Sequence, residues 1–335
     1  MSVLTIQPMR QDEIPQVVEL WNQAITAQGE GYERHWQSVA RLEQTVDDPN
    51  FLPAGALTAK VDGELVGFGL GYVQTVDFLG TGDIPGLPGR LAGIAVRPDH
   101  WRHGIGSRLL EAIEGILGSH GKTELSFAVY HAMPLALIRS IHLDTGPYYF
   151  LKSRGYQDLE HDLVFHNDLT SFEIRPWVFE RKQRLQEEGF EVRWYKREDR
   201  DRVLEFMRRC FSQAWYTIVE TAVSAPRLPE IMLVLHDGQP VAFIGPFDTN
   251  ERRFYFSTDA RPGWGGFGSP GVDPEIRQRG IATVLWHLGL DHLRQCGARF
   301  TEYGTGLVNP AQHLYFRSGA TLIEISCDDM IKILP

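Results

Sequence analysis

Hydrophobic and polar positions follow the same order in the two halves of the chain. Residues 5–21 and 191–207 each read as a short strand, a charged turn and a helix whose apolar residues recur at helical spacing. Two apolar runs then flank Asp62 in the first half and Asp237 in the second, each followed by glycine, which predicts a tight β-hairpin. A strand, a loop, a helix, a strand, a small helix and a last strand complete each half. The pattern predicts a mixed α/β domain of roughly 150 residues that is present twice.

The join between the halves is expected near residue 175, which gives domains 1–175 and 176–335. Residues 176–189 read as a connecting helix with Gly189 as its C-terminal stop. No low-complexity or proline-rich linker separates the halves, so we expect the two domains to pack on each other.

A strand that ends at a proline and a glycine-containing loop lead into a helix at the same place in each half. In the second half Val272 ends the strand, Pro274 breaks it and a helix follows from Ile281. A helix start leaves four backbone N–H groups unpaired at the positive end of its dipole, and Ser, Thr, Asp or Asn normally caps it. Residues 277–280 offer no good acceptor, while their arginines add positive charge and their glycine permits close approach. The loop suits an external anion, most simply a pyrophosphate, although an ordinary turn with solvated arginines is the alternative.

At these loops the sequence resembles the GNAT superfamily of acyl-CoA-dependent N-acetyltransferases. Its signature is a strand that ends in Val-x-Pro, followed by Arg/Gln-x-x-Gly-x-Gly/Ala at the opening of a helix. The second half carries the full signature in Val272, Pro274, Arg277, Gly280 and Ala282. The first half matches at Val96, Pro98, Gly104 and Gly106, has Trp101 where Arg or Gln is expected, and keeps charge nearby in Arg102 and His103.

The resemblance implies two tandem GNAT-like domains, each a mixed, largely antiparallel sheet flanked by helices, with acetyl-CoA as cosubstrate. Backbone amides of residues 278–282 would hold the pyrophosphate, the motif strand would pair with pantetheine, and a splay between this strand and the next would admit the acceptor amine. Pro270 departs from the pattern because it has no N–H to donate, so Gly271 and Val272 must supply such a contact. The expected cofactor-binding residues are Gly271, Val272, Asp273, Arg277, Gln278, Arg279, Gly280, Ile281, Ala282, Thr283 and Asn309 in the second half, and Val96, Arg102, His103, Gly104, Ile105, Gly106 and Ser107 in the first.

A tyrosine four residues before a glycine, in the pattern Asn-x5-Tyr, often protonates the departing thiolate in this family. The second half has Asn309, Tyr315 and Gly319 in this arrangement, and Asn309 can cap the small helix. The resemblance therefore assigns the general acid to Tyr315, with a core aromatic residue as the alternative.

The first half keeps neither residue, since Thr145 and Leu151 occupy the matching positions. Its interval from the loop glycine to the helix-ending Gly155 is also 12 residues longer than in the second half (51 against 39). Tyr148 or Tyr149 would have to replace the acid there. We expect a catalytic second half and a degenerate first half that binds acyl-CoA weakly or serves as a scaffold.

The general base has weaker candidates. Glu302 lies on the strand after the motif helix, where family members sometimes carry a carboxylate that acts through water, and Asp259 precedes the motif strand. Exposed strand carboxylates are usually only solvated, which is the alternative for both residues. The histidines His287, His292 and His313 are expected at the surface.

Net charge, cysteine count and the length of the apolar runs exclude several classes of protein. The formal net charge of −10 argues against a broad nucleic-acid-binding surface, which needs clustered Lys and Arg. The three cysteines are too few and too scattered for a disulfide framework or a zinc site, and no other metal site is expected. No run has the length of a signal peptide core or a membrane span, so a soluble cytoplasmic protein, without membrane or nucleic-acid partners, is the default expectation.

These patterns favour an N-acetyltransferase, a monomer or homodimer, that moves an acetyl group from acetyl-CoA to a primary amine of a small molecule or of a peptide. The amine would attack directly in a ternary complex, without a covalent enzyme intermediate. Two alternatives stay open: a non-catalytic acyl-CoA-binding or structural tandem module, and an acetyltransferase like mycothiol synthase, which is also a tandem GNAT protein.

Overall fold

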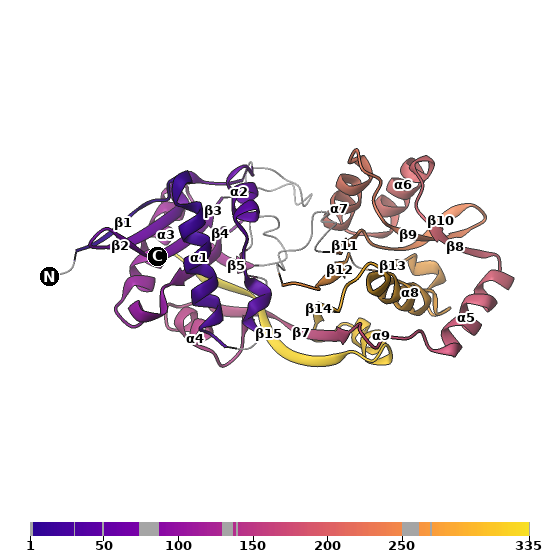
Figure 1. Cartoon of the computed structure of the whole chain (residues 1–335). Helices are drawn as coiled ribbons and strands as arrows, with labels where there is room; N and C mark the ends of the chain where they lie inside the picture. The colour runs from indigo at the N-terminus through magenta and orange to yellow at the C-terminus, as the bar shows by residue number, and fades with distance from the viewer. Residues whose placement is uncertain are drawn as a thin grey trace.

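The computed structural model describes residues 3–29, 31–48, 50–73, 87–128, 137–138, 140–249, 261–268 and 270–334. The two halves lie at opposite ends of the molecule, and the long strands β7 (Gln157–Asp168) and β15 (Thr321–Ile333) run between them (Figure 1). The mixed α/β class is confirmed, and so is the order of elements in each half.

The first half contains β1 (Leu4–Pro8), α1 (Ile14–Thr26), α2 (Val39–Val46), β2 (Ala56–Val61), β3 (Glu64–Tyr72), β4 (Gly89–Val96), α3 (Ile105–Ser119), β5 (Glu124–Ala128), β6 (Ile141–His142) and α4 (Gly146–Lys152), followed by β7. The second half contains α5 (Pro176–Glu187), β8 (Phe190–Trp194), α6 (Arg200–Cys210), α7 (Gln213–Ser224), β9 (Met232–His236), β10 (Gln239–Ile244), β11 (Phe247–Thr249), β12 (Gly265–Phe267), β13 (Gly271–Val272), α8 (Ile281–Gln295), β14 (Phe300–Gly306) and α9 (Ala311–Arg317), followed by β15.

Local sequence signals are confirmed at the turns. Asp62 and Asp237 have φ of 50° and 49°, and the glycine after each is also left-handed, as the tightest hairpin turn requires. The connecting helix forms as predicted and stops before Gly189, whose φ is 87°. Helices α2 and α7 were not predicted.

Helix α3 lies close to the sheet because glycines on β3 leave room for it. An added Cβ at Gly71 would lie 2.4 Å from Ile113 Cγ2, and one at Gly69 would lie 2.8 Å from Ile113 Cδ1. Leu109 and Ile113 are consequently fully buried, which fixes the helix and the loop before it against the sheet.

The last strand of each half crosses into the other half. The main sheet has the order β1-β2-β3-β4-β5-β15-β7-β14, with β4 and β5 parallel and the other neighbours antiparallel. The end of β7, Asp162–Asp168, pairs with β14, whereas the end of β15, Asp329–Ile333, pairs with β5. The halves are thus joined by exchanged strands as well as by α5, and the boundary near residue 175 stays a prediction.

The remaining described strands of the second half form a sheet of order β13-β10-β9-β8 and a separate pair of β11 with β12. A core of aliphatic and aromatic side chains fills the space between α8, β9, β10 and the end of β7. None of the described helices is both long enough and apolar enough to cross a membrane.

Candidate functional site

The two repeated loops have the same backbone shape. Each contains a short 3-10 turn, Pro98–His100 or Pro274–Ile276, and then enters a helix of 15 residues. The residue two before the loop glycine has a positive φ in both, 65° at Arg102 and 68° at Gln278. Gly104 and Gly280 follow with φ of 78° and 83°, values that suit only glycine without strain. The sequence match at these positions therefore corresponds to a shared conformation.

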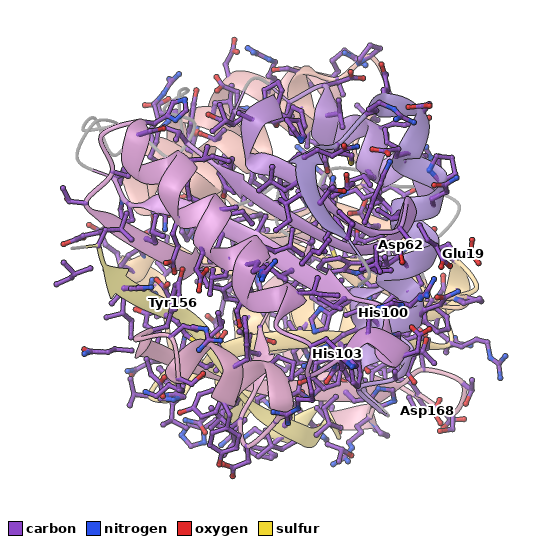
Figure 2. The ribbon with its side chains drawn as sticks, turned by 90° about the vertical axis from the view of Figure 1, so that its left-hand side faces the viewer. Glu19, Asp62, His100, His103, Tyr156 and Asp168 are labelled. Carbon is purple, nitrogen blue, oxygen red and sulfur yellow. The ribbon has the colours of Figure 1, made fainter. Side chains whose placement is uncertain are left out.

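The starts of α3 and α8 lack an internal cap. Among the described residues no side chain accepts a hydrogen bond from the first turn of either helix. At Gly104 no described atom lies within 4 Å of the position that a Cβ would take, so the first-half loop is open. His100 and His103 mark this loop beside the start of α3 (Figure 2). Both helix starts present N–H donors and a positive dipole end to a ligand.

The second-half loop has an additional cation that the sequence patterns missed. The side chain of Arg181, on α5, lies over Gly280, where an added Cβ would be 2.4 Å from its Cδ and Nη1. Its Nη1 donates to the carbonyl oxygen of Arg279 over 3.4 Å. The Arg279 side chain turns away and pairs with Glu188 at 3.1 Å. An anion at this loop would meet the Arg181 guanidinium together with the backbone amides.

Other predicted residues of the second-half loop support its shape. Asp273 is buried, pairs with Arg209 at 2.9 Å, and accepts a hydrogen bond from the Glu275 amide. Arg277 Nε donates to the Val272 carbonyl over 3.3 Å. Asp273 therefore holds the turn, and its carboxylate would not favour an anion.

Other residues predicted to bind the cofactor differ in how deeply they are buried. Ile105 and Ile281 are buried in the cores, whereas Gly106, Ala282 and Thr283 are half-buried in the first helical turns. Ser107 accepts a hydrogen bond from Arg154. Asn309 Oδ1 accepts from the Ala311 amide over 2.9 Å, which caps α9 as predicted.

Both halves have a splay beside the motif strand. In the first half β4 and β5 pair only at Gly89 with Leu125 and at Arg90 with Ser126. In the second half a single parallel bridge joins Trp264 to Phe300. Beyond these contacts, the described part of the motif strand in each half is not paired with the strand that follows the motif helix. Pro270 lies between β12 and β13, so it interrupts the second motif strand.

The extra residues of the first half fill part of its splay. The Leu137 amide donates to the Ala92 carbonyl of β4 over 3.3 Å, and Ile141 and His142 pair with β15. Leu137 therefore occupies a point on the edge of β4 that would face pantetheine in the resemblance. The filled splay supports a degenerate first half.

His142 anchors residues 140–142 through contacts with Tyr32, Arg34 and Glu324. Its ring stacks on Tyr32 with centroids 3.8 Å apart. Arg34 Nη2 lies 3.0 Å from His142 Nε2, and Glu324 lies 3.1 Å from Nδ1. Arginine can only donate, so Nε2 accepts and Nδ1–H donates to the carboxylate. Burial, and then the charge of Arg34, lower the pKa of His142 to about 3.

Tyr315 lies in an aromatic cluster with only 6% of its surface exposed. The ring centroids of Trp286 and Tyr303 are each 4.6 Å from its own. The acid role of Tyr315 stays a prediction. In the first half, both tyrosines considered as replacements for this acid already donate their hydroxyl protons to carboxylates: Tyr148 to Asp158, and Tyr149 to Asp144.

Glu302 is held as an anion. Arg261 donates to both of its oxygens, at 3.2 and 2.5 Å, and His166 Nδ1 lies 3.3 Å from Oε1. Burial alone would raise the pKa of Glu302, but the hydrogen bonds from His166 and Arg261 outweigh it and lower the pKa to about 2. A carboxylate with such a pKa is a weak proton acceptor at neutral pH. Asp259, the other candidate, lies outside the described residues.

The expectation that His287 lies at the surface is wrong. Its ring is 1% exposed, packs against Trp177, and has Nδ1 2.8 Å from the Thr283 carbonyl. The inward face of α8 carries it because α5 covers that side of the helix.

Comparison with known proteins finds the same family domain in both halves of the chain. The profile of the acetyltransferase (GNAT) family matches residues 15–138 and 182–320. A solved structure described as a GCN5-related glucosamine N-acetyltransferase region in a fungal multi-domain GH3 β-N-acetylglucosaminidase is similar over 99% of this chain, with a TM-score of 0.77 and 16% identity. This chain spans 38% of the length of that protein.

Two further structures match along nearly their whole length. A tandem GNAT protein from the clavulanic acid biosynthesis pathway has a TM-score of 0.69 and 15% identity, with 99% of this chain and 98% of that chain covered. A GCN5-related N-acetyltransferase from Sphaerobacter thermophilus has a TM-score of 0.66 and 16% identity, with 98% and 95% covered. Sequence comparison with curated proteins gives no match. At these identities the likeness establishes the fold.

Proposed function

Because the chain belongs to the acetyltransferase (GNAT) family and carries its domain twice, we propose that it transfers the acetyl group of acetyl-CoA to a primary amine of a small molecule. Family membership itself supports an acyltransferase. The acetyl donor, the amine class and the direct attack in a ternary complex are the finer parts of the proposal.

The observation that carries the proposal is the uncapped start of α8. Its amides, the left-handed Gly280 and the Arg181 guanidinium together form a cradle for a diphosphate. The second half also keeps every signature residue, whereas the first-half splay holds Leu137. We therefore assign catalysis to the second half and a weak binding or scaffold role to the first.

In this mechanism the two substrates meet at the splay between the motif strand and β14. The neutral amine attacks the thioester carbonyl carbon, the carbon–sulfur bond breaks, and the thiolate takes a proton from Tyr315. The tyrosinate regains a proton when the nitrogen loses its extra one to become the amide. Backbone amides at Gly271 and Val272 stabilise the charge that develops on the carbonyl oxygen. Fixed orientation of the two substrates supplies a large share of the rate.

Calorimetry with acetyl-CoA and with CoA tests the proposal. We expect saturable binding that Gly280→Val abolishes, because a side chain there displaces Arg181 and a φ of 83° strains any residue but glycine. Gly104→Val, at the matching position of the first half, is the control and should leave the tighter binding event intact. An absence of heat with wild-type protein would refute the proposal.

A panel of amines, with release of free CoA thiol as the readout, separates the enzyme from a non-catalytic acyl-CoA-binding module. The panel should include polyamines and aminoglycosides, since the chain is acidic. Binding without transfer to any amine would favour the module.

A further inference from the structure

Transfer to an amine requires a group that removes a proton from the ammonium form of the acceptor, and Glu302 is too weak a base for that task. The imidazole of His166 lies directly on it, with Nδ1 3.3 Å from Glu302 Oε1. Arg261 holds both carboxylate oxygens, so the carboxylate is fixed in position and charge. A histidine oriented by an anchored carboxylate is the usual arrangement of a catalytic base.

The other nitrogen of His166 is available. The side chain is 33% exposed, and its Nε2 has no hydrogen-bond partner among the residues that the structure describes. The ring stacks on Phe300 with centroids 5.8 Å apart, which fixes its plane. It lines a groove of about 380 Å³ together with Asp168, Thr170, Pro262, Arg299 and Phe300.

This groove lies beside the point where the motif strand joins β14, because Pro262, Arg299 and Phe300 line it. Trp264 bridges to Phe300, the Arg299 amide donates to the Gly263 carbonyl over 2.7 Å, and Pro262 precedes Trp264 by two residues. A ligand in the groove would therefore lie next to the bridge, and the second-half splay begins on the other side of that bridge. That is where the proposed function brings the amine and the thioester together.

We propose that His166 is the general base of the second half and that Glu302 is its positioning residue, an inference that rests on the proposed function. The anionic Glu302 accepts Nδ1–H, which leaves the Nε2 lone pair facing the groove. An ammonium group in the groove gives one proton to Nε2, and its nitrogen then attacks the thioester carbonyl. Tyr315 protonates the departing thiolate and regains a proton from the nitrogen of the intermediate, which loses its extra proton as the amide forms. The imidazolium returns the first proton to solvent at its exposed edge.

The base comes from the first half of the chain. His166 lies on the part of β7 that crosses over and pairs with β14, directly opposite Glu302. The second-half site is complete only when this exchanged strand is in place. A comparison of the two repeats would not find the residue, because it looks for the base within the second half.

Steady-state kinetics on an amine that the panel identifies tests the inference. His166→Gln and His166→Ala should lower kcat at least about 100-fold with KM for acetyl-CoA unchanged, which is the scale of general base catalysis. Added imidazole should partly restore His166→Ala. His161→Gln is the matched control, because His161 lies on the same strand with a similarly exposed side chain (35%) and contacts Asp158 in the first half.

Glu302→Gln separates the positioning role from a structural one. We expect kcat to fall, but less than in the His166 variants, with KM for acetyl-CoA unchanged, because a neutral amide holds Nδ1–H less strongly than a carboxylate does. The other charged groups that face His166 are Arg261, Asp168 and Arg299, and they are unchanged in this variant.

The outcomes distinguish the two proposals. Wild-type transfer with full kcat in both His166 variants, or with full kcat in Glu302→Gln, would refute the base assignment alone. No transfer by wild-type protein to any amine would refute the proposed function and this inference with it. Unfolding midpoints of the variants near that of wild type would exclude loss of the fold as the cause.

Discussion

Replacing His142 by glutamine should make the protein more resistant to acid. In the folded state the Nε2 of His142 accepts from Arg34 and its Nδ1–H donates to Glu324. A second proton would point at the guanidinium, so the folded protein binds it poorly and the pKa falls from 6.5 to about 3. Glutamine can also accept from Arg34 and donate to Glu324, but it carries no titrating proton.

The expected magnitude follows from proton linkage. The unfolded chain binds the proton with a pKa near 6.5, so the stability contributed by neutral His142 is complete above that pH and is lost as the pH falls from 6.5 towards 3. One pKa unit corresponds to about 1.4 kcal/mol, so wild-type protein should lose about 3 kcal/mol from this group between pH 7 and pH 4. Burial raises the pKa of Glu324, but that carboxyl is present in both proteins.

Urea unfolding at pH 7 and at pH 4 measures the difference. The fall in the free energy of unfolding should be about 3 kcal/mol smaller in His142→Gln than in wild type. His120→Gln, which changes an exposed histidine at the end of α3, is the control and should behave as wild type. If the free energy of unfolding fell equally in wild type and in His142→Gln, His142 would not be held neutral in the folded protein. That result would refute the hydrogen-bonding arrangement described for His142.

Three further changes test other parts of the structure. Tyr315→Phe should lower kcat and leave the calorimetric Kd for acetyl-CoA unchanged, and an unchanged kcat would remove Tyr315 from the mechanism. Arg181→Ala should weaken acetyl-CoA binding roughly tenfold or more, on the scale of a hydrogen bond to a charged group, while Arg184→Ala on the same helix should not. Gly71→Ala should destabilise the fold by about 1–3 kcal/mol in urea unfolding, because its Cβ would overlap Ile113, whereas Gly115→Ala, with no described atom near, should not.

The features that the sequence predicts well are local ones. The hairpin at Asp62, the stop at Gly189 and the cap at Asn309 each depend on residues within one turn of the chain, and each is confirmed. The φ of 83° at Gly280 is also a local feature, since glycine adopts it without strain. Such conformations are determined before any tertiary contact forms.

The features that the sequence did not predict join residues far apart in the chain. Arg181 and Gly280 are on different helices, and Tyr32 meets His142 through a stack that no pattern of spacing indicates. Glu302 was a reasonable candidate for a base by its position on β14. Its pKa is decided by Arg261 and His166, which only the folded chain brings to it.

Strand exchange gives the chain a physical reason to keep both halves. Without the end of β7, one edge of β14 would have unpaired backbone groups, and an exposed strand edge invites pairing with other chains. Without the end of β15, β5 would lose its antiparallel neighbour in the same way. Each half therefore needs the other to complete its sheet, whether or not both halves bind acyl-CoA. The first half would therefore be required for the proposed second-half site even without a catalytic role of its own.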